Sequence, residues 1–446
     1  MAFVVLTIVA PISLGRANVQ SSPGQIWCPS KVSITPPFLS YPGFTLSYQL
    51  ADEYFQRIHQ IMSLLDDENV EIIGAMKKFG PRNLQSIARK SGVPYPTVYT
   101  RVNKLGTQGL LDTWTYPNLA KIGLARSMVL LTPSPGREVI ASEALKIPGY
   151  WLWIARCTGE CNGYYSQHAV PVENRQDFVQ YLDQIVSSGL ATSYRIFWLG
   201  DYHSHIPNFE YYDFKKRAWR FDWPAWLSLF MRGKSVQNGS EEKESSKDDF
   251  DKNDLLILKE LMKDARKKLS ELSQMIGMTL PAAKYRFDNL ARRGFLQDYV
   301  IQVLPYPPEI SDLYEVRLDF GEHKAMIAKE NFFKRLPFVL NYSRIKGTNS
   351  ITLRVYLPRT EVNNLLTLLS ALVRGGAIDR FSYMLLDPMT IQSQTFHYKA
   401  YEDKSGWRYD NQEYLAALRK LVSSFDKAEA PAVTFPPSKG LPVSMM

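Results

Sequence analysis

The sequence predicts an α+β fold built from two repeats, each a winged helix-turn-helix followed by a ferredoxin-like βαββαβ domain. A shift of 185 positions aligns residues 66–111 with residues 251–296 without a gap, and the two segments share ten residues at expected turns and core faces. A shift of 187 then aligns a strand-helix-strand-strand-helix-strand pattern that follows each segment. Because 446 residues exceed what one hydrophobic core serves, several domains are expected.

Three helices are expected in each aligned segment, and the last two form the helix-turn-helix. Gly92 and Gly277 fall at the turn between these two helices, where glycine adopts a positive φ at little cost. In the last helix, apolar residues recur at i, i+4 and i+7 and mark a buried stripe. The stripe residues are Val98, Val102 and Leu105 in the first copy and Ala283, Phe287 and Leu290 in the second.

Strand patterns follow each helical segment. "LLDTWTYPNLAKIGL" and "FLQDYVIQVLPYPPEI" alternate with period two, so each copy is expected to form its own short wing ribbon. The βαββαβ elements of the first copy are predicted at Arg126–Thr132, Glu138–Lys146, Trp151–Thr158, Tyr164–Val170, Glu173–Ser188 and Thr192–Leu199. Those of the second copy are predicted at Tyr314–Phe320, Ala325–Leu336, Val339–Lys346, Ser350–Leu357, Thr360–Arg374 and Asp379–Leu386.

Each copy ends in a related tail, marked by "AWRFDW" at 218–223 and "GWRYDN" at 406–411. The echo predicts one packing task for both tails, such as capping a sheet. The basic and apolar mixture around the first motif also allows a membrane-surface helix. A further helix is expected at residues 411–425, docked on the core or on another chain.

These patterns divide the chain into seven parts. The predicted parts are a poorly ordered leader (1–48), winged helix-turn-helix 1 (49–123), ferredoxin-like domain 1 with its tail (124–232), a flexible charged linker (233–250), winged helix-turn-helix 2 (251–304), ferredoxin-like domain 2 with its tail (305–410), and a C-terminal helix with a disordered tail (411–446).

Composition adds weaker constraints. The 53 Lys and Arg against 44 Asp and Glu give a net charge of +9, which favours polyanionic partners. Three cysteines are too few for a disulfide-stapled fold and fit a reducing cytoplasm. The apolar start "MAFVVLTIVAPISLG" lacks a preceding basic residue and is interrupted by Pro11, so neither an export signal nor a membrane span is predicted.

A winged helix-turn-helix ending in "TVYTRVNKLGTQGLL" or "AAKYRFDNLARRGFL" and followed by a βαββαβ domain resembles the Lrp/AsnC transcriptional regulators. The resemblance covers residues 66–200 and 251–387. It implies a DNA-binding regulator whose α+β domain mediates dimerisation and, in many members, senses a small-molecule effector, an amino acid. Two fused units would make one chain an intrachain pseudo-dimer and leave a further homo-oligomer open.

The last helix of each copy carries a polar face opposite its buried stripe. Asparagine can read adenine edges, and Lys or Arg can bind guanine or phosphate. We predict contacts to double-stranded DNA from Tyr95, Thr97, Thr100, Asn103 and Lys104 in the first copy and from Lys284, Tyr285, Asn289, Arg292 and Arg293 in the second. Asp288 would repel phosphate unless it accepts from cytosine or pairs with an arginine, so the copies read different sequences or one mostly holds the backbone. Arg101 and Arg286 flank the stripe and either brace the fold through a carboxylate or touch phosphate.

The effector and metal predictions are mostly negative. The family often has a Gly-x-x-Asp-like turn near its effector pocket, and here Gly159 with Asn162, and Gly347 with Ser350, lack the acidic residue. Amino-acid binding is therefore disfavoured. Cys157, Cys161, His203 and His205 could be drawn as a zinc cluster, but the second copy has no counterparts, so no metal and no cofactor is predicted.

An enzyme is the alternative from another class. The layout also looks like that of the sirohaem decarboxylases, which carry a His-Arg-Tyr-Asn-like stretch on the third strand. The equivalent strands here read "GYYSQHAVP" and "SITLRVYLP", so only His168 matches. We therefore predict a regulator without enzymatic activity and keep the decarboxylase as the alternative.

Overall fold

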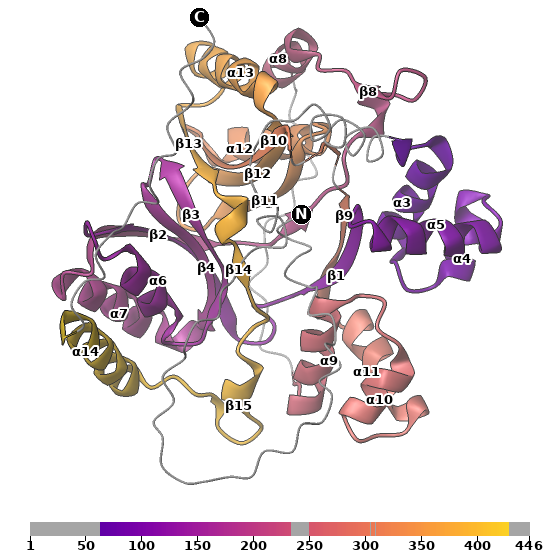
Figure 1. Ribbon diagram of the computed structural model, residues 1–446. Coiled ribbons are helices and arrows are strands. Elements are labelled where there is room, and N and C mark those ends of the chain that lie inside the picture. Colours follow the sequence, from indigo (N-terminus) through magenta and orange to yellow (C-terminus); the bar gives the residue numbers. More distant parts are fainter. Residues whose placement is uncertain (1–62, 233–248, 304, 308, 428–446) are drawn as a thin grey trace, which may run out of the picture.

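The computed structural model describes residues 63–232, 249–303, 305–307 and 309–427 (Figure 1). The predicted leader, most of the linker and the tail after residue 427 lie outside these ranges. Within them, every helix is too short or too polar to cross a bilayer.

Two helical units have the predicted three-helix order. Helical unit 1 contains α3 (Asp67–Phe79), α4 (Leu84–Ser91) and α5 (Tyr95–Thr107), and helical unit 2 contains α9 (Lys252–Lys263), α10 (Leu269–Met275) and α11 (Leu280–Arg292). Each first helix is capped by an aspartate side chain, Asp66 or Asp251, that accepts a backbone N–H three residues on. All three predicted stripe residues of α5 are buried, whereas Phe287 of α11 is only partly covered.

The prediction that each copy forms its own wing is wrong. Strand β1 (Leu111–Pro117) of the first copy pairs antiparallel with β9 (Leu296–Val303) of the second, in register from Leu111 with Val303 to Thr115 with Tyr299. We call this two-stranded sheet the ribbon. The alternating pattern of each segment predicted a strand correctly, but it carries no information about which strand is the partner.

Two sheet units follow the predicted βαββαβ order. Sheet unit 1 contains β2 (Leu124–Pro133), α6 (Glu138–Lys146), β3 (Trp151–Gly159), β4 (Gly163–Pro171), α7 (Arg175–Ser187) and β5 (Ala191–Leu199). Sheet unit 2 contains β10 (Ser311–Asp319), α12 (His323–Phe333), β11 (Val339–Ile345), β12 (Ser350–Pro358), α13 (Val362–Arg374) and β13 (Arg380–Leu386). The strand orders β3-β4-β2-β5 and β11-β12-β10-β13 are the same in the two units and place the first and third strands in the centre.

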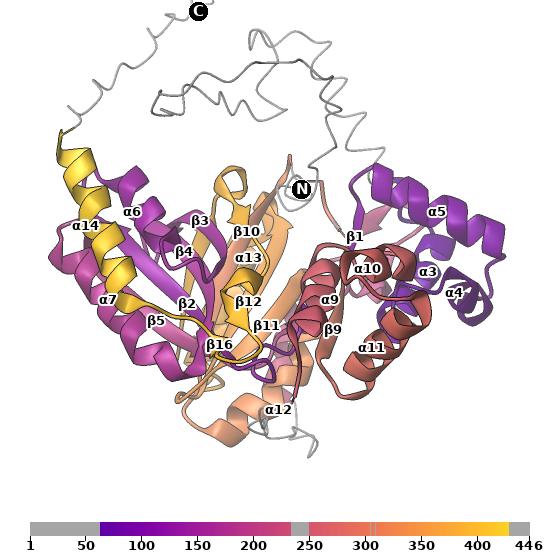
Figure 2. The same cartoon turned by 90° about the horizontal axis from the view of Figure 1, so that it is seen from below.

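The two sheets join into a closed ring of eight strands (Figure 2). β13 pairs with β3 between Met384 and Gly159 at one joint, and β5 pairs with β11 between Leu199 and Ile345 at the other. At each joint, the last strand of one sheet unit meets the second strand of the other. The ring therefore has an inner face to which both units contribute, and this face is available for a site.

The tails complete each copy. Tail 1 (residues 203–232) contains β6 (His203–Ser204), β7 (Tyr212–Asp213), β8 (Ala218–Trp219) and α8 (Trp223–Arg232). Tail 2 (residues 388–427) contains β14 (Gln392–Ser393), β15 (Tyr401–Glu402), β16 (Gly406–Trp407) and α14 (Asn411–Lys427). Short 3-10 turns stand at Phe209–Tyr211 in tail 1 and at Pro388–Thr390 and Tyr398–Ala400 in tail 2.

Both tails perform one task, as their echo predicts: each pairs a two-residue strand with the opposite sheet unit, β6 with β11 and β14 with β3, and covers the helices of that unit. α8 of the first copy packs on α12 and α13, and α14 of the second copy packs on α6 and α7 (Figure 1). The matched tryptophans act alike: Trp219 Nε1 donates to the Pro305 carbonyl at 2.7 Å, and Trp407 Nε1 donates to the Ile122 carbonyl at 2.5 Å. The tail of each copy thus packs on the sheet unit of the other copy.

Candidate nucleic-acid interface

Helices α5 and α11 are placed by the same local devices. Gly92 and Gly277 end the preceding helices with φ angles of 74° and 65°, a conformation that favours glycine. Each helix carries a proline in its first turn, where the missing N–H leaves no hydrogen bond unmade. The repeated glycine and proline therefore set the direction in which each candidate reading helix leaves its turn.

The two matched arginines brace the fold. Arg101 binds Asp66 at 2.5 Å and also binds Glu68, so it ties α5 to the start of α3. Arg286 binds Asp251 and Asp254, both at 2.8 Å, and ties α11 to the start of α9 in the same way. Of the two roles left open by the sequence, the structure gives both arginines the carboxylate role.

The predicted reading face of α5 is largely open. Tyr95, Thr100 and Lys104 are exposed, and Thr97 and Asn103 are partly covered. The Thr100 hydroxyl donates to the Pro96 carbonyl one turn back at 2.9 Å. It can still accept a hydrogen bond, but its donor is in use within the helix.

The predicted reading face of α11 is open as well, with one exception. Lys284, Tyr285 and Arg292 are exposed, and Asn289 is partly covered. The Arg293 guanidinium lies over the Phe295 ring at 5.0 Å, and the Arg293 carbonyl accepts from Lys121 at 2.7 Å. Arg293 thus faces the ribbon side of its helix, apart from the other four residues.

Two exposed aromatic residues, Tyr99 and Phe79, were not predicted as contact residues. Tyr99 is 51% exposed beside Tyr95, with ring centroids 6.3 Å apart, at the start of α5. Phe79, at the end of α3, is flanked by the ammonium groups of Lys78 and Lys90 at 5.4 and 5.3 Å from its ring. The spacing of Tyr95 and Tyr99 by one helical turn was a usable signal, because it places both rings on one side of the helix.

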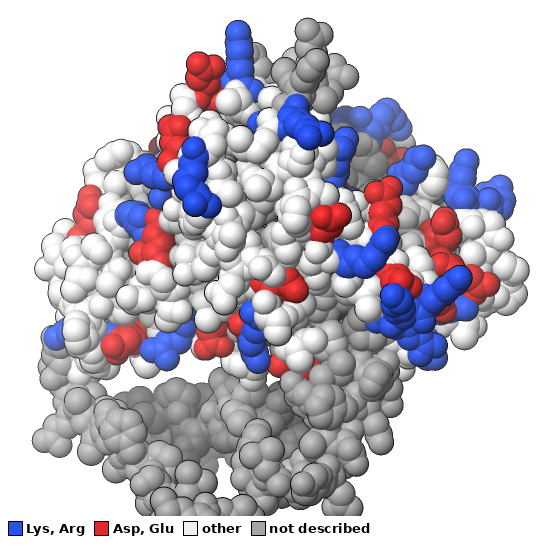
Figure 3. Space-filling model, turned by 90° about the horizontal axis from the view of Figure 1, so that it is seen from above, with Lys and Arg blue, Asp and Glu red and all other residues white. Residues whose placement is uncertain are grey.

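Charged residues are interleaved on this part of the surface. Figure 3 shows blue and red side chains mixed on the side where Figure 1 places helical unit 1. The segments 66–111 and 251–296 carry only a modest excess of Lys and Arg over Asp and Glu. The field at this surface is therefore mildly positive, which fits a reader that combines base contacts with backbone contacts.

The helical units are fixed to one another as well as to the ribbon. Arg82 of unit 1 donates to the carbonyls of Ala265 and Lys267 in unit 2 at 2.7 and 2.8 Å, and its guanidinium lies over the Phe287 ring. Lys77 of α3 binds Asp298 of β9 at 2.7 Å. Burial lowers the pKa of Lys77, and the Asp298 carboxylate opposes this shift. The two candidate reading helices thus belong to one contiguous block.

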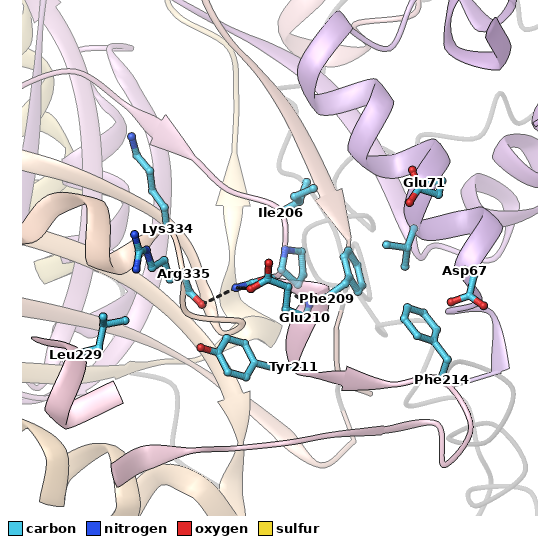
Figure 4. A pocket seen from close by; sticks show the side chains of 13 residues that line it. Asp67, Glu71, Ile206, Phe209, Glu210, Tyr211, Phe214, Leu229, Lys334 and Arg335 are labelled. Atoms are coloured by element: carbon cyan, nitrogen blue, oxygen red, sulfur yellow. Dashed lines mark hydrogen bonds between the residues drawn. The ribbon is translucent and has the colours of Figure 1, made fainter. Parts of the chain in front are cut away.

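A cleft of about 880 Å³ separates the start of α3 from tail 1 (Figure 4). Asp67 and Glu71 of α3 face it from one side, and Phe209, Tyr211 and Phe214 of tail 1 face it from the other. Across the cleft floor, the Asn208 amide donates to the Arg335 carbonyl at 3.0 Å and links tail 1 to sheet unit 2.

The four predicted effector residues lie at two turns of the ring. Gly159, with a φ of 118°, sits so close to β13 that an added Cβ would be 2.8 Å from the Tyr383 carbonyl oxygen. Asn162 accepts from the Gly159 amide at 3.1 Å, and Ser350 donates to Asp319 at 2.6 Å. Gly347 forms an open turn. Three of the four residues therefore have structural partners, and effector binding by this set stays a prediction.

The Cys and His residues considered for a metal site or an enzyme are buried or packed against aromatic rings. Cys157 and Cys161 are buried at the β3–β4 turn, while His203 and His205 stack on Tyr342 of β11. His168 is 1% exposed, packs on Phe178 of α7, and has a pKa lowered to about 3 by burial. The one residue that hinted at a decarboxylase is therefore held neutral beneath a helix.

Comparisons with known proteins concern the helical units first. A family model described as a winged helix-turn-helix DNA-binding domain matches residues 250–297. Over 94 residues, the chain is 29% identical to an uncharacterized HTH-type transcriptional regulator of Pyrococcus furiosus and 26% identical to one of Pyrococcus horikoshii. Each match covers 20% of this chain and 63% of the relative, so the chain spans less than two thirds of these relatives.

Solved structures give fold-level neighbours with low scores. The sirohaem decarboxylase NirDL covers 81% of this chain and 100% of its own, with 12% identity and a TM-score of 0.45. LrpC of Bacillus subtilis covers 31% of this chain and 95% of its own, with 18% identity and a TM-score of 0.27. Residues 250–297 thus match a winged helix-turn-helix DNA-binding domain, and a 94-residue part of the chain is similar to HTH-type transcriptional regulators.

Proposed function

We propose that the chain is a sequence-specific, non-enzymatic DNA-binding transcriptional regulator in which the two helical units act as a pseudo-dimer. The observation that carries the proposal is the pairing of two open polar helix faces on one fixed block. α5 and α11 are braced to the matched aspartates Asp66 and Asp251 by Arg101 and Arg286, and the ribbon and Arg82 hold the two units together. Two coupled helices of this kind suit adjacent major grooves, roughly 34 Å apart or a multiple of that distance.

The two half-sites are expected to differ. α5 offers Asn103 and Lys104, whereas α11 offers Lys284, Asn289 and Arg292 beside the exposed Asp288. A carboxylate on the reading face disfavours phosphate and selects for a cytosine amino group. The bound sequence should therefore be an imperfect palindrome, with different bases under the two helices.

Selection of bound duplexes from a random pool tests the proposal. We expect a recovered motif with two half-sites at one helical-turn spacing, and an affinity that falls with salt. If six phosphates are neutralised, the log–log slope should be about −5. Recovery of no enriched sequence, with a flat salt response, would contradict DNA binding.

Variants separate the two reading helices. The triple substitution T100A/N103A/K104A should abolish base preference at one half-site, and K284A/N289A/R292A should abolish it at the other. The matched control N363A/T367A/R374A alters three exposed residues of α13 and should leave the motif unchanged. An unaltered motif in both test variants would refute the assigned reading faces.

A further inference from the structure

A cavity of about 600 Å³ lies between the ribbon, α9 and the ring of strands. β1 contributes Trp114 and Tyr116, β9 contributes Gln302, and the inner face of the ring contributes Trp153 and Arg354. Both copies therefore build its wall. It is separate from the two turns that hold the predicted effector residues.

The cavity wall is rich in aromatic rings. Tyr116 and Tyr202 stack on one another with centroids 4.2 Å apart, and both line the cavity together with Trp114 and Trp153. Flat, rigid rings of this kind favour a planar ligand, because stacking adds to the gain from burying apolar surface.

A buried ion pair stands at the same wall. Arg354 is 8% exposed, lies over the Trp153 ring at 4.5 Å, and binds Glu315 at 2.6 Å. Glu315 is 3% exposed and also accepts from Thr352. The charge of Glu315 is therefore matched by Arg354.

A second buried guanidinium lies outside the cavity lining, next to its stacked tyrosines, and has no ion-paired carboxylate among the described residues. Arg126 is 6% exposed, and its guanidinium lies over the Tyr116 and Tyr202 rings at 5.7 and 5.4 Å. One nitrogen donates to Ser343, while Nε and Nη1 have no hydrogen-bond partner among the described residues. Gln302 Nε2, in the cavity wall, is also a buried donor without a partner in this part of the chain.

A buried charge without a counter-charge is strongly unfavourable, and so is a buried donor without an acceptor. Arg354 and Glu315 cancel, and so do Lys263 and Asp112, which also line the cavity, so that Arg126 leaves one positive charge in excess. A single negative charge brought in by a ligand would offset that excess across the Tyr116 and Tyr202 rings, and its oxygens would accept from the Gln302 amide in the wall.

We propose that this cavity binds a planar aromatic carboxylate, with its ring among Trp114, Tyr116 and Trp153 and its carboxylate oriented by the excess charge of Arg126 and by the Gln302 amide. The proposal stands independently of DNA binding, since every residue in it belongs to the ribbon or to the ring.

Calorimetric titration of the full chain tests it with three probes: benzoate, indole-3-carboxylate and 2-naphthoate. At least one should bind in the micromolar to millimolar range, and neutral indole-3-carboxamide should bind at least about tenfold more weakly than indole-3-carboxylate. Failure of all three carboxylates, or equal binding of the carboxamide, would overturn the proposal.

Variants locate the charge. Arg126→Met should weaken carboxylate binding at least about tenfold and raise the thermal midpoint, because it removes an unpaired buried charge. Arg359→Met is the matched control, since the Arg359 side chain is 59% exposed and pairs with Asp312 outside the cavity. Gln302→Leu should weaken carboxylate binding several-fold. It provides a second test of the cavity if R126M does not fold. Binding unchanged by both cavity variants would overturn the assignment.

Discussion

A cleft separates helical unit 1 from tail 1, whereas helical unit 2 packs directly against tail 2. In unit 2, the Lys252 amide donates to Asp403 at 2.7 Å, and Lys259 lies over the Tyr398 ring at 5.3 Å. In unit 1, the equivalent space between α3 and tail 1 is the open cleft of Figure 4. The Arg–Asp braces, in contrast, are the same in both units. The two copies therefore share the ion pairs inside each helical unit but differ in the contacts between that unit and its tail.

The largest expected loss of stability comes from substitutions in the two tails, each of which packs on the other copy. Trp226 of α8 is fully buried against sheet unit 2, and Leu418 of α14 is 2% exposed against sheet unit 1. We expect Trp226→Ala to cost about 3–5 kcal/mol of unfolding free energy and Leu418→Ala about 2–4 kcal/mol, because both leave cavities. Urea denaturation followed by circular dichroism measures both. Met389→Ala, at a residue 59% exposed, should change stability by less than about 0.5 kcal/mol. A smaller loss for W226A than for M389A would show that tail 1 is not anchored there.

The elements were predictable because their signals are local. The bounds of α6, for example, agree with the predicted Glu138–Lys146, since the spacing of apolar residues along one helix determines its buried face. The partner of a strand is not a local property. "LDTWTYP" specifies alternation, but the choice of β9 as partner depends on a segment 185 residues away. The tails follow the same rule: the shared Trp219 and Trp407 motif predicts a common role without naming the surface that each tail covers.

Acid should affect copy 1 more than copy 2. His168 is buried in β4, and its counterpart in β12 is Val355. Burial lowers the pKa of His168, and that of His205, from the ordinary histidine value of 6.5 to about 3. The unfolded chain therefore binds more protons between these values, so the stability contribution is complete above pH 6.5 and falls as the pH falls. Each histidine should cost about 2 kcal/mol between pH 7 and pH 5.

The variant H168V imports the copy 2 residue and checks this difference. Urea midpoints at pH 7 and pH 5 should lie closer together in H168V than in the parent chain, by an amount equivalent to about 2 kcal/mol. The matched control is H323V, which replaces an exposed histidine at the start of α12 in place of a buried one. An unchanged pH dependence in H168V would mean that His168 binds protons equally in the folded and the unfolded chain.

The two braces should differ in strength because they share the matched aspartate but differ in the second carboxylate. Arg286 binds Asp254, whose side chain is 12% exposed, whereas Arg101 binds Asp66 and Glu68, whose side chains are 45% and 51% exposed. Water therefore screens the ion pairs of Arg101 more effectively than that of Arg286 with Asp254. We expect Arg286→Met to cost about 1–2 kcal/mol and Arg101→Met less than about 1 kcal/mol in thermal or urea unfolding. The reverse order would indicate that the exposed brace is the stronger one.

The candidate interface was predicted in outline and missed in detail. Helical periodicity placed Lys104, Lys284 and Arg292 on open faces, and all three are exposed. It did not identify the local contact of the Arg293 guanidinium with the Phe295 ring. It also could not foresee that Lys121 of the first copy donates to the Arg293 carbonyl, because that contact depends on how the two copies pack. The cavity beside Arg126 and Arg354 was beyond sequence reasoning altogether, since its walls come from strands of both copies.

The smallest expected effect distinguishes the reading faces themselves. Asp288 is exposed on α11, where the aligned residue of α5 is Asn103. If Asp288 only repels phosphate, Asp288→Asn should tighten binding to an unselected duplex about threefold at low salt, with less gain at high salt. Fluorescence anisotropy at two salt concentrations measures this change. The control Glu143→Gln removes an exposed carboxylate from α6, which covers the opposite part of the molecule, and should leave the affinity unchanged. If D288N instead weakens binding to the selected motif alone, Asp288 reads a base, and the divergence of the two helices is a matter of sequence preference and not of charge.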